Sequence, residues 1–492
     1  MNKKHYLVYI VIAVLLCFIP FGAMSFYRTE TTTENKTLKE MPSLTTENGY
    51  NINILSDLGD YFTDRFAFRN EMVSLNSYIS AKLLKTSTVD DVIMGGDGWL
   101  YYSATLDDFR HDNPVSERMI YNMAHNVKLM QDYVEAEGKT FVFTVAPNKN
   151  SLYGGNMPNR YKYTIEARSD VERLIPYLIS EGVNYVDVYS LFKSEPEVLY
   201  YKGDSHWNNK GAVLAYNALL DAADKDHETY DDTEPEIVSD YYGDLNKMLY
   251  SSLAEPEKDY KYREVFPYAT LDSNSTVEDD IVETINPSAE GNLLMYRDSF
   301  GNSLLPYMAS EFENGYFSKV VPYKVSEDLS STDADIVIAE KVERHLPTLA
   351  QVVPEMEAPA EYENTEDISI DFGLEDIELD GEGLVKLLND KAGTRGWNPR
   401  ESDGISTYEI TSQGEYLRID GSVTEGSIDL NSPIYVQIEY GEDIVSYGAF
   451  CVSSKEGDYG FTALIRPQEG DITALDIVGV LNGELVMLKK GN

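Results

Sequence analysis

The sequence predicts an α/β domain with a parallel sheet, preceded by an N-terminal membrane anchor and followed by a C-terminal β-sandwich domain. An uncharged apolar run near the N-terminus is long enough to cross a bilayer. Over residues 51–350, strand-like runs alternate with amphipathic helical patterns, which is typical of a parallel sheet covered by helices. From residue 368 onward, short alternating runs separated by Gly, Asp and Asn favour a sandwich. A chain of 492 residues has room for these separate domains.

The apolar run covers residues 6–26, and Lys3 and Lys4 precede it. Positive charge before a span keeps the N-terminus inside and places the rest of the chain outside the cytoplasm. We therefore expect residues 1–26 to be an uncleaved anchor in the cell membrane, with an extracytoplasmic body. Cleavage near the end of the run, which would release a secreted protein, is the alternative. Residues 27–50 are polar and lack an apolar period, which predicts a tether.

Helical and strand-like patterns alternate through the predicted α/β domain. Helical apolar spacing is found at residues 55–84, 116–137, 165–180, 209–223 and 302–312. Buried-type strand runs are found at residues 139–149, 184–189, 292–300 and 334–344, and a Gly-Asp-Gly turn predicts a hairpin over residues 92–102. Asn208 or Asn209 is the expected N-cap of the fourth helix.

A domain boundary is expected at residues 351–367, which are rich in Pro and Glu and have no apolar period. Residues 368–492 then form the predicted β-sandwich, which resembles a carbohydrate-binding module in architecture alone. Within it, Trp397, Tyr435 and Tyr459 are either sugar-stacking residues or part of the core.

The composition restricts the classes of partner. A net charge of −44 excludes nucleic acid, because a polyanion repels such a surface, and it disfavours docking of the whole chain on anionic lipid. The 37 tyrosines suit sugar faces, although tyrosine also fills half-buried strands. Two cysteines, one of them in the apolar run, form no metal-binding cluster. We expect neither a metal nor a cofactor.

The stretch Asp204-Ser205-His206-Trp207 precedes a predicted helix and has three interpretations. A carboxylate two residues from a histidine can orient the imidazole for proton transfer. The same pair could bind a metal, but it supplies only two ligands, and no third His or Cys has suitable spacing. The third interpretation is a loop aspartate that caps the helix beside a packed histidine.

Ser299 follows an apolar strand and precedes a helix, and Gly301 permits a tight turn. Such a strand–Ser–Gly–helix arrangement exposes a nucleophile, and the unpaired amides of a helix start stabilise an oxyanion. A Ser299 nucleophile combined with the Asp204–His206 pair would make a complete acyl-transfer site.

Five motifs carry a family resemblance over about residues 55 to 345: GDGWLYY, APNKNSLYGGNMP, YKGDSHWNNKGA, YYGDL and RDSFGNSLLPYM. In their order the chain resembles the SGNH-hydrolase-like proteins of the alginate O-acetyltransferase type and the related DHHW proteins. The serine follows the Asp-His pair, which reverses the order of ordinary SGNH esterases. The resemblance implies a triad that moves acetyl groups on or off extracellular polysaccharides. It implies Ser299 as nucleophile, His206 as base and Asp204 as orienting acid.

Further candidates surround this triad. The oxyanion hole is expected to use Asn148 and the backbone of Ser299. The candidates for substrate binding are Tyr101, Lys149, Trp207, Arg297 and Trp397.

The expected function is therefore O-acetyl transfer to an extracellular or cell-wall polysaccharide through an acyl-serine. The resemblance also implies a membrane-bound O-acyltransferase partner that supplies the acetyl groups. Two alternatives remain: a carbohydrate acetylesterase with the same triad, and a non-catalytic glycan-binding or assembly protein.

Overall fold

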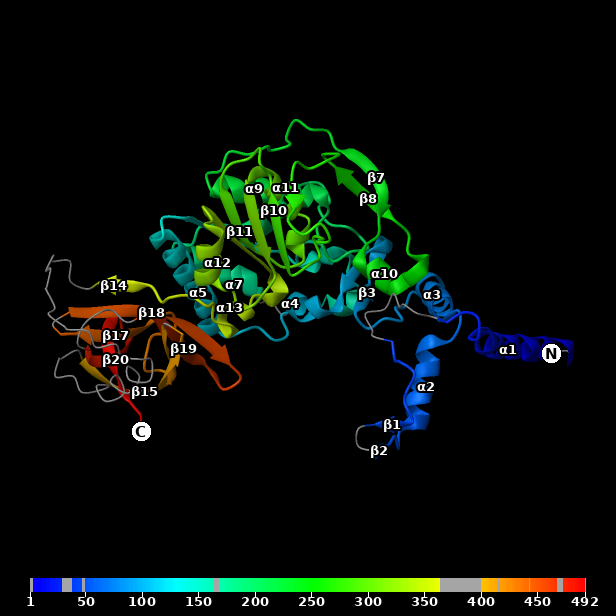
Figure 1. Cartoon of the computed structure of the whole chain (residues 1–492), viewed down its shortest axis with the longest axis horizontal. Coiled ribbons are helices and arrows are strands. Elements are labelled where there is room, and N and C mark those ends of the chain that lie inside the picture. The colour runs from blue at the N-terminus through cyan, green and yellow to red at the C-terminus, as the bar shows by residue number, and fades with distance from the viewer. Residues whose placement is uncertain are drawn as a thin grey trace.

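The computed structural model describes residues 3–28, 38–46, 49–162, 168–362, 400–414, 416–441, 443–466 and 472–491. Helix α1 (Lys3–Ala23) lies at one end of the molecule, the α/β domain lies in the middle, and an all-β domain lies at the other end (Figure 1). The segment Tyr6–Ala23 is long and apolar enough to cross a membrane, a property that signal sequences share.

The central sheet has seven strands in the order β6–β5–β13–β11–β12–β10–β9. Their bounds are β5 Thr140–Ala146, β6 Tyr185–Val186, β9 Ala269–Thr270, β10 Ile281–Ile285, β11 Asn292–Tyr296, β12 Asn314–Ser318 and β13 Ile336–Val342. The strands from β6 to β12 run parallel, whereas β10 and β9 pair antiparallel at one edge. The α/β prediction is confirmed, and the expected parallel sheet is corrected to a mixed one.

Helices cover both faces of this sheet. One face packs against α8 (Val188–Ser194), α9 (Asn209–Ala222) and α11 (Leu305–Glu311). The other face packs against α5 (Glu117–Ala136), α7 (Asp170–Ser180), α12 (Val325–Thr332) and α13 (Thr348–Gln351). Strand β5 directs Val142 to the first core and Phe141 and Phe143 to the second. This alternation explains its unbroken apolar run, because both faces of the strand are buried.

Local capping explains where the predicted helices begin. The Ser116 hydroxyl caps α5, and Ser169 forms a capping box with Glu172 at the start of α7. The Asn208 side chain accepts from two amides at the start of α9, as expected. These helix predictions are confirmed. The first residues of the helix predicted over 165–180 fall in the stretch 163–167, which lies outside the described residues.

The N-terminal helical pattern is split in two. It forms α2 (Ile54–Arg65) and α3 (Arg69–Ile79), which ends in a π-helical turn at Ser80–Leu84. The break lies at Phe68, which has a left-handed backbone with φ of 63°. A small hairpin of β1 (Thr45–Thr46) and β2 (Gly49–Tyr50) precedes α2. The predicted hairpin after α3 is confirmed as β3 (Val92–Met94) and β4 (Leu100–Tyr102).

The C-terminal domain is all-β, as predicted. Its strands are β14 Ala360–Tyr362, β15 Arg400–Gln413, β16 Tyr416–Val423, β17 Ile434–Tyr440, β18 Asp443–Ser454, β19 Gly457–Ile465, β20 Ile472–Leu481 and β21 Glu484–Lys490. Seven of them close into a ring, because β18 pairs with both β17 and β19, and β14 adds to β18. The fold is therefore a barrel-like sandwich.

Helix α5 joins the two domains through buried polar side chains. The Arg118 guanidinium donates to the carbonyls of Leu430 (3.2 Å) and Ser432 (2.6 Å). Asn122 donates to the Ser453 hydroxyl at 3.0 Å, and Asn126 exchanges two hydrogen bonds with the Cys451 backbone. We call Arg118, Asn122 and Asn126 the docking cluster; each is at most 2% exposed. Their backbone partners fix how the barrel sits on α5.

The described part of the predicted linker includes residues that pack against the rest of the molecule. Met356 and Ala358 are 1% and 4% exposed, and Ala358 donates its amide hydrogen to Leu464 O at 2.6 Å. Residues 363–367 lie outside the described residues. The domain boundary at residues 351–367 stays a prediction.

Candidate active site

Three neighbouring parallel strands end at one edge of the central sheet. β5 leads to Asn148 and Lys149, β11 leads to Ser299, and β13, which lies between these strands, leads to Glu343 and Arg344. In open α/β sheets, sites form at the carboxyl ends of the strands. This edge therefore gathers polar groups from distant parts of the chain.

The turn that carries Ser299 is held on both sides by Asp298. One carboxylate oxygen of Asp298 accepts from Phe300 N (2.9 Å), and the other accepts from Val342 N (2.7 Å). A 3₁₀ turn, Phe300–Asn302, then leads towards α11. Ser299 is half-buried, and within the described residues its backbone N–H donates to no protein acceptor. The two Asp298 contacts therefore hold the turn on both sides of Ser299, which is not fully enclosed.

The loop before α9 supplies the other half of the site. His206 Nδ1 lies 2.6 Å from Asp204 Oδ1, and His206 Nε2 lies 2.8 Å from Ser299 Oγ. Since an ionised carboxylate only accepts, Nδ1 donates to Asp204, and Nε2 is left to accept the Ser299 proton. The His206 ring also packs edge-on against Phe300, with centroids 4.7 Å apart. The structure thus brings together Asp204, His206 and Ser299, the three side chains predicted to form the triad.

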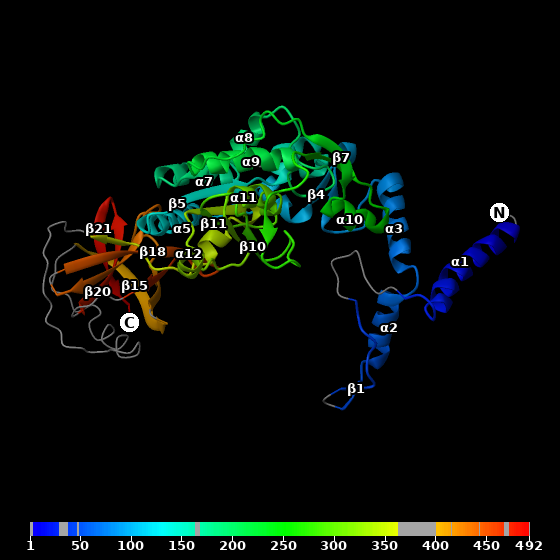
Figure 2. The ribbon, with the colours of Figure 1, turned by 45° about the horizontal axis from the view of Figure 1, so that its top comes forward.

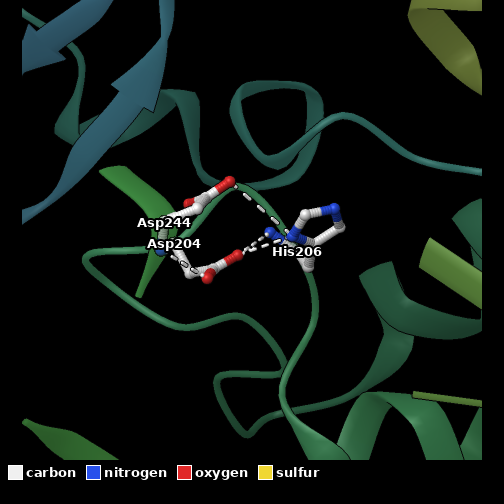
Figure 3. Close-up of side chains that lie close together, drawn as sticks. All are labelled: Asp204, His206 and Asp244. Atoms are coloured by element: carbon white, nitrogen blue, oxygen red, sulfur yellow. Dashed lines mark hydrogen bonds and ion pairs between the residues drawn. The ribbon is translucent and has the colours of Figure 1, made fainter. Parts of the chain in front are cut away.

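Two residues that the sequence reasoning did not assign hold Asp204. The second oxygen of Asp204 accepts from the Tyr241 hydroxyl (2.8 Å) and from the Asp244 amide (2.7 Å). Tyr241 ends β7 (Glu236–Tyr241), and Asp244 begins α10 (Asp244–Tyr250). Figure 3 shows Asp204 and Asp244 on the same side of the His206 ring. Tyr241 and Asp244 both belong to the YYGDL motif, which was noted only as part of a resemblance.

The electrostatics of the pair favour an oriented base. Burial opposes ionisation of Asp204, but the His206 charge and the hydrogen bonds that Asp204 accepts hold its pKa well below the ordinary value. Burial lowers the pKa of His206, yet the charge of Asp204, its hydrogen bond and the charge of Asp244 raise it above the ordinary value overall. The positive charge of Arg344 opposes this rise.

Asp204, His206 and Asp244 lie close enough together to be considered as metal ligands. Their ligand atoms already serve other partners, however. Both Asp204 oxygens accept two hydrogen bonds each, and the Asp244 carboxylate accepts from the amide and hydroxyl of Ser205. A cation at this position would have to displace these donors. The geometry therefore favours a hydrogen-bonded site over a metal site.

One family model matches part of the chain. Residues 92–288 match the family described as "SGNH hydrolase-like domain, acetyltransferase AlgX". The predicted resemblance is confirmed. The matched stretch contains Asp204 and His206 and ends before Ser299, so the position of the serine is known from the geometry described above.

Several solved structures are similar to the chain. PatB1 of Bacillus cereus is 16% identical, with a TM-score of 0.41, and the match covers 52% of this chain and 96% of PatB1. A DHHW family protein of Eubacterium siraeum is 16% identical, with a TM-score of 0.37 and coverage of 46% and 85%. AlgX of Pseudomonas aeruginosa is 13% identical, with a TM-score of 0.34 and coverage of 81% and 94%. No curated protein matches the chain. Because the scores are low, no residue role is transferred from these structures.

Lys149 lies beneath the site instead of facing substrate. It is 3% exposed, and its ammonium donates to the carbonyls of Tyr201 (3.2 Å), Lys202 (3.0 Å) and Asp204 (2.5 Å). Burial lowers the pKa of Lys149 to about 8, while the charge of Asp204 opposes this shift. The assignment of Lys149 as a substrate contact is therefore corrected, because it supports the loop that carries the Asp-His pair.

Three other substrate-binding candidates are also buried. Tyr101, Trp207 and Arg297 are 1%, 1% and 2% exposed. Tyr101 donates to Tyr153 O at 2.7 Å, and Trp207 donates to Ser303 Oγ at 2.6 Å. Arg297 donates to the Asn302 side chain and to three backbone carbonyls, those of Val277, Asp279 and Asp298. These side chains support the turn and the loop of the site, which corrects their predicted roles. Trp397 lies outside the described residues.

Asn148 is engaged by two carboxylates. Its backbone N–H donates to Glu343 Oε2 at 2.8 Å, and its side-chain amide donates to Asp108 Oδ2 at 2.9 Å. Burial raises the pKa of Glu343 to about 7 and that of Asp108 to about 6. This arrangement does not favour Asn148 as an oxyanion donor.

Arg344 is a cation that the sequence reasoning missed. Its guanidinium lies 5.7 Å from the ring centroids of both Tyr102 and Phe300, and it is half-buried. Within the described residues it makes no ion pair with a carboxylate. Its position after β13 was the available signal, because neighbouring strand ends meet at this edge. Arg344 thus places positive charge near His206 in a strongly acidic protein.

Proposed function

We propose that the chain is an O-acetyltransferase that modifies an extracytoplasmic glycan through an acyl-Ser299 intermediate. The observation that carries this proposal is the unbroken hydrogen-bonded path from Asp204 through His206 to the accessible Ser299 hydroxyl. The family match to an acetyltransferase domain supports the acyl group.

In the first half-reaction, Ser299 Oγ attacks the carbonyl carbon of an acetyl donor while His206 Nε2 takes its proton. Asp204 stabilises the imidazolium that forms and keeps Nδ1 protonated. The Ser299 backbone N–H and the Arg344 guanidinium are our candidates for stabilising the oxyanion. His206 then returns the proton to the leaving group, and the C–O bond to that group breaks, which leaves acetyl-Ser299.

In the second half-reaction, a sugar hydroxyl attacks the acetyl carbonyl. His206 takes the proton of that hydroxyl, and the tetrahedral intermediate collapses with return of the proton to Ser299 Oγ. The product is an acetylated sugar, and the free serine is restored. Water in place of the sugar would make the same site an esterase.

The acetyl supply and the location belong to the same proposal. If α1 spans the membrane, the site lies outside the cytoplasm, where acetyl donors must be delivered across the bilayer. We propose a membrane-bound O-acyltransferase as that source, and a cell-wall or secreted polysaccharide as the acceptor.

A single assay separates transfer from hydrolysis. The purified chain is incubated with p-nitrophenyl acetate, with and without glycan oligomers, and products are followed by mass spectrometry. Acetylated oligomers that depend on Ser299 are expected. Acetate as the sole product with every acceptor tested would assign an esterase, and no Ser299-dependent turnover would defeat the enzyme.

A matched serine variant controls for the substitution itself. Ser310 on α11 is buried, and its hydroxyl donates to Pro306 O at 2.7 Å. Ser310→Ala removes a hydroxyl from the same domain without touching the site. It should retain turnover, whereas Ser299→Ala should not.

A further inference from the structure

The C-terminal end of α1 packs directly on the junction between α2 and α3. Phe21 stacks on Phe62 with ring centroids 5.3 Å apart, and Tyr27 stacks on Phe68 at 5.4 Å. Arg28 also donates to the Tyr61 hydroxyl at 3.1 Å. In Figures 1 and 2, α2 and α3 extend from this junction in different directions, and α1 leaves it to one side. If α1 spans a bilayer, this junction lies at the outer surface of that bilayer.

Helix α3 and the π-helical turn that follows it have apolar residues on their solvent side. Leu75, Ile79 and Leu83, spaced four residues apart, are 53%, 43% and 76% exposed. The opposite side buries Ser74 and Ser77, which are 0% and 2% exposed. A surface helix normally turns its apolar face inward, so this orientation is reversed for a helix that faces water.

Polar contacts hold that orientation. The amide and hydroxyl of Ser252 contact the Ser74 hydroxyl at 3.2 and 3.1 Å, and the Ser77 and Thr88 hydroxyls lie 2.6 Å apart. The serine side of α3 is therefore bound to the body of the molecule. The side that carries Leu75, Ile79 and Leu83 faces away from the body of the molecule.

The other arm of the junction is apolar as well. Tyr50, Ile52 and Leu55, at the hairpin and the start of α2, are 87%, 92% and 83% exposed. These are among the most exposed large apolar side chains of the described residues. They and the α3 residues flank the end of α1 from two directions.

The local charge differs in sign from that of the whole chain. Residues 69–85 carry Arg69, Lys82 and Lys85 against the single acid Glu71, a net charge of +2, whereas the chain carries −44. Lys82 and Lys85 are exposed at the end of the apolar stripe. A basic helix with an outward apolar face is the pattern of helices that lie in a membrane interface.

We propose that Leu75, Ile79 and Leu83, with Tyr50, Ile52 and Leu55 on the other arm, rest in the outer interface of the lipid bilayer. Lys82 and Lys85 then meet lipid phosphates. This surface would hold α2 and α3 along the membrane and fix the height of the active site above it. The inference rests on the proposed anchoring by α1 and is independent of the acetyl-transfer chemistry.

Depth-dependent quenching tests this surface in the full chain. Single cysteines replace Ile79 and Leu83 in a Cys17→Ala background, in which the remaining Cys451 is fully buried. Each site carries an environment-sensitive fluorophore, and the chain is reconstituted into bilayers with or without brominated phospholipid. Leu485 in the barrel is the matched control, because it is 43% exposed, as is Ile79. Phe26→Cys reports insertion of α1.

The expected result is a loss of fluorescence at positions 79 and 83 in brominated lipid, comparable to the loss at position 26, with no loss at position 485. Quenching at position 26 without quenching at 79 and 83 would overturn the inference and leave the anchor intact. Equal quenching at 485 would also overturn it, because the contact would then be unspecific. An unquenched position 26 would defeat the anchoring and this inference together, while acetyl transfer is measured separately. Protection of position 83 that appears only after a membrane acyltransferase is added would assign the surface to a protein partner.

Discussion

Two groups of buried polar side chains in this molecule differ in where their hydrogen bonds end. In the docking cluster, Arg118, Asn122 and Asn126 donate mainly to backbone atoms of the barrel. In the site, the hydrogen bonds run from Asp204 through His206 and end on an accessible hydroxyl. The first arrangement satisfies buried donors and joins two domains. The second orients the His206 ring towards the Ser299 hydroxyl, a group that can react. Burial of polar side chains alone therefore does not mark a functional site.

The largest effect on activity is expected from Ser299→Ala and His206→Ala, two substitutions in the site. Each should lower kcat by about 10⁶-fold, as in serine hydrolases whose triad members act as a unit. The double variant should be little worse than either single one. Stopped-flow or endpoint hydrolysis of p-nitrophenyl acetate measures the loss, and a residual rate within tenfold of the parent would remove Ser299 from the mechanism.

Asp204→Asn should lower kcat by about 10⁴-fold, because an amide in place of the carboxylate favours the wrong tautomer of His206. Circular dichroism should show a folded protein. Full activity in a folded Asp204→Asn variant would argue that the carboxylate has a structural role alone.

A matched pair of buried cations sharpens the comparison further. Lys149 and Arg118 are 3% and 1% exposed, and both donate to backbone carbonyls. Replacing either by Met leaves buried acceptors unpaired, at a cost of about 1–3 kcal/mol for each acceptor. Lys149→Met should also lower kcat per folded molecule, because its partners carry the Asp-His pair. Arg118→Met should lower the melting temperature with kcat unchanged; equal effects of both variants on kcat would erase the distinction.

The smallest effect is expected on the pH dependence. His206 must be neutral to accept the Ser299 proton, so kcat/KM should rise with pH through its raised pKa, above the ordinary value of about 6.5. The negative charge of Asp244 contributes to that rise, so Asp244→Asn should move the limb to lower pH. Arg344→Gln removes a nearby positive charge and should move it to higher pH. Shifts of the opposite sign in a kcat/KM profile would contradict the electrostatic assignment.

Local signals in the sequence explain which parts of this account were predictable. Strand ends and helix caps, such as Asn208, are encoded within a few residues, and the Asp-Ser-His-Trp and Asp-Ser-Phe-Gly stretches stand at such ends. The support of Asp204 by Tyr241 and Asp244 was missed, because a tyrosine and an aspartate 37 to 40 residues further along the chain carry no local signal that they contact Asp204. The antiparallel edge was missed because β9 and β10 are short and lie among polar loops.

The wrong substrate contacts have one physical cause. Lys149, Trp207 and Arg297 were predicted as candidates for substrate binding. Here each hydrogen-bonds to a loop or turn of the site and is buried. A single sequence does not distinguish a side chain above a loop from one below it.

Trapping of the acyl-enzyme tests the central claim most directly. The chain is mixed with p-nitrophenyl acetate, quenched in acid within the first turnover and analysed by intact and peptide mass spectrometry. We predict one acetyl group per chain, located on Ser299, that disappears when glycan oligomers are added and is absent in Ser299→Ala. Rapid turnover with no adduct on Ser299, or an acetyl group that persists in Ser299→Ala, would contradict the account.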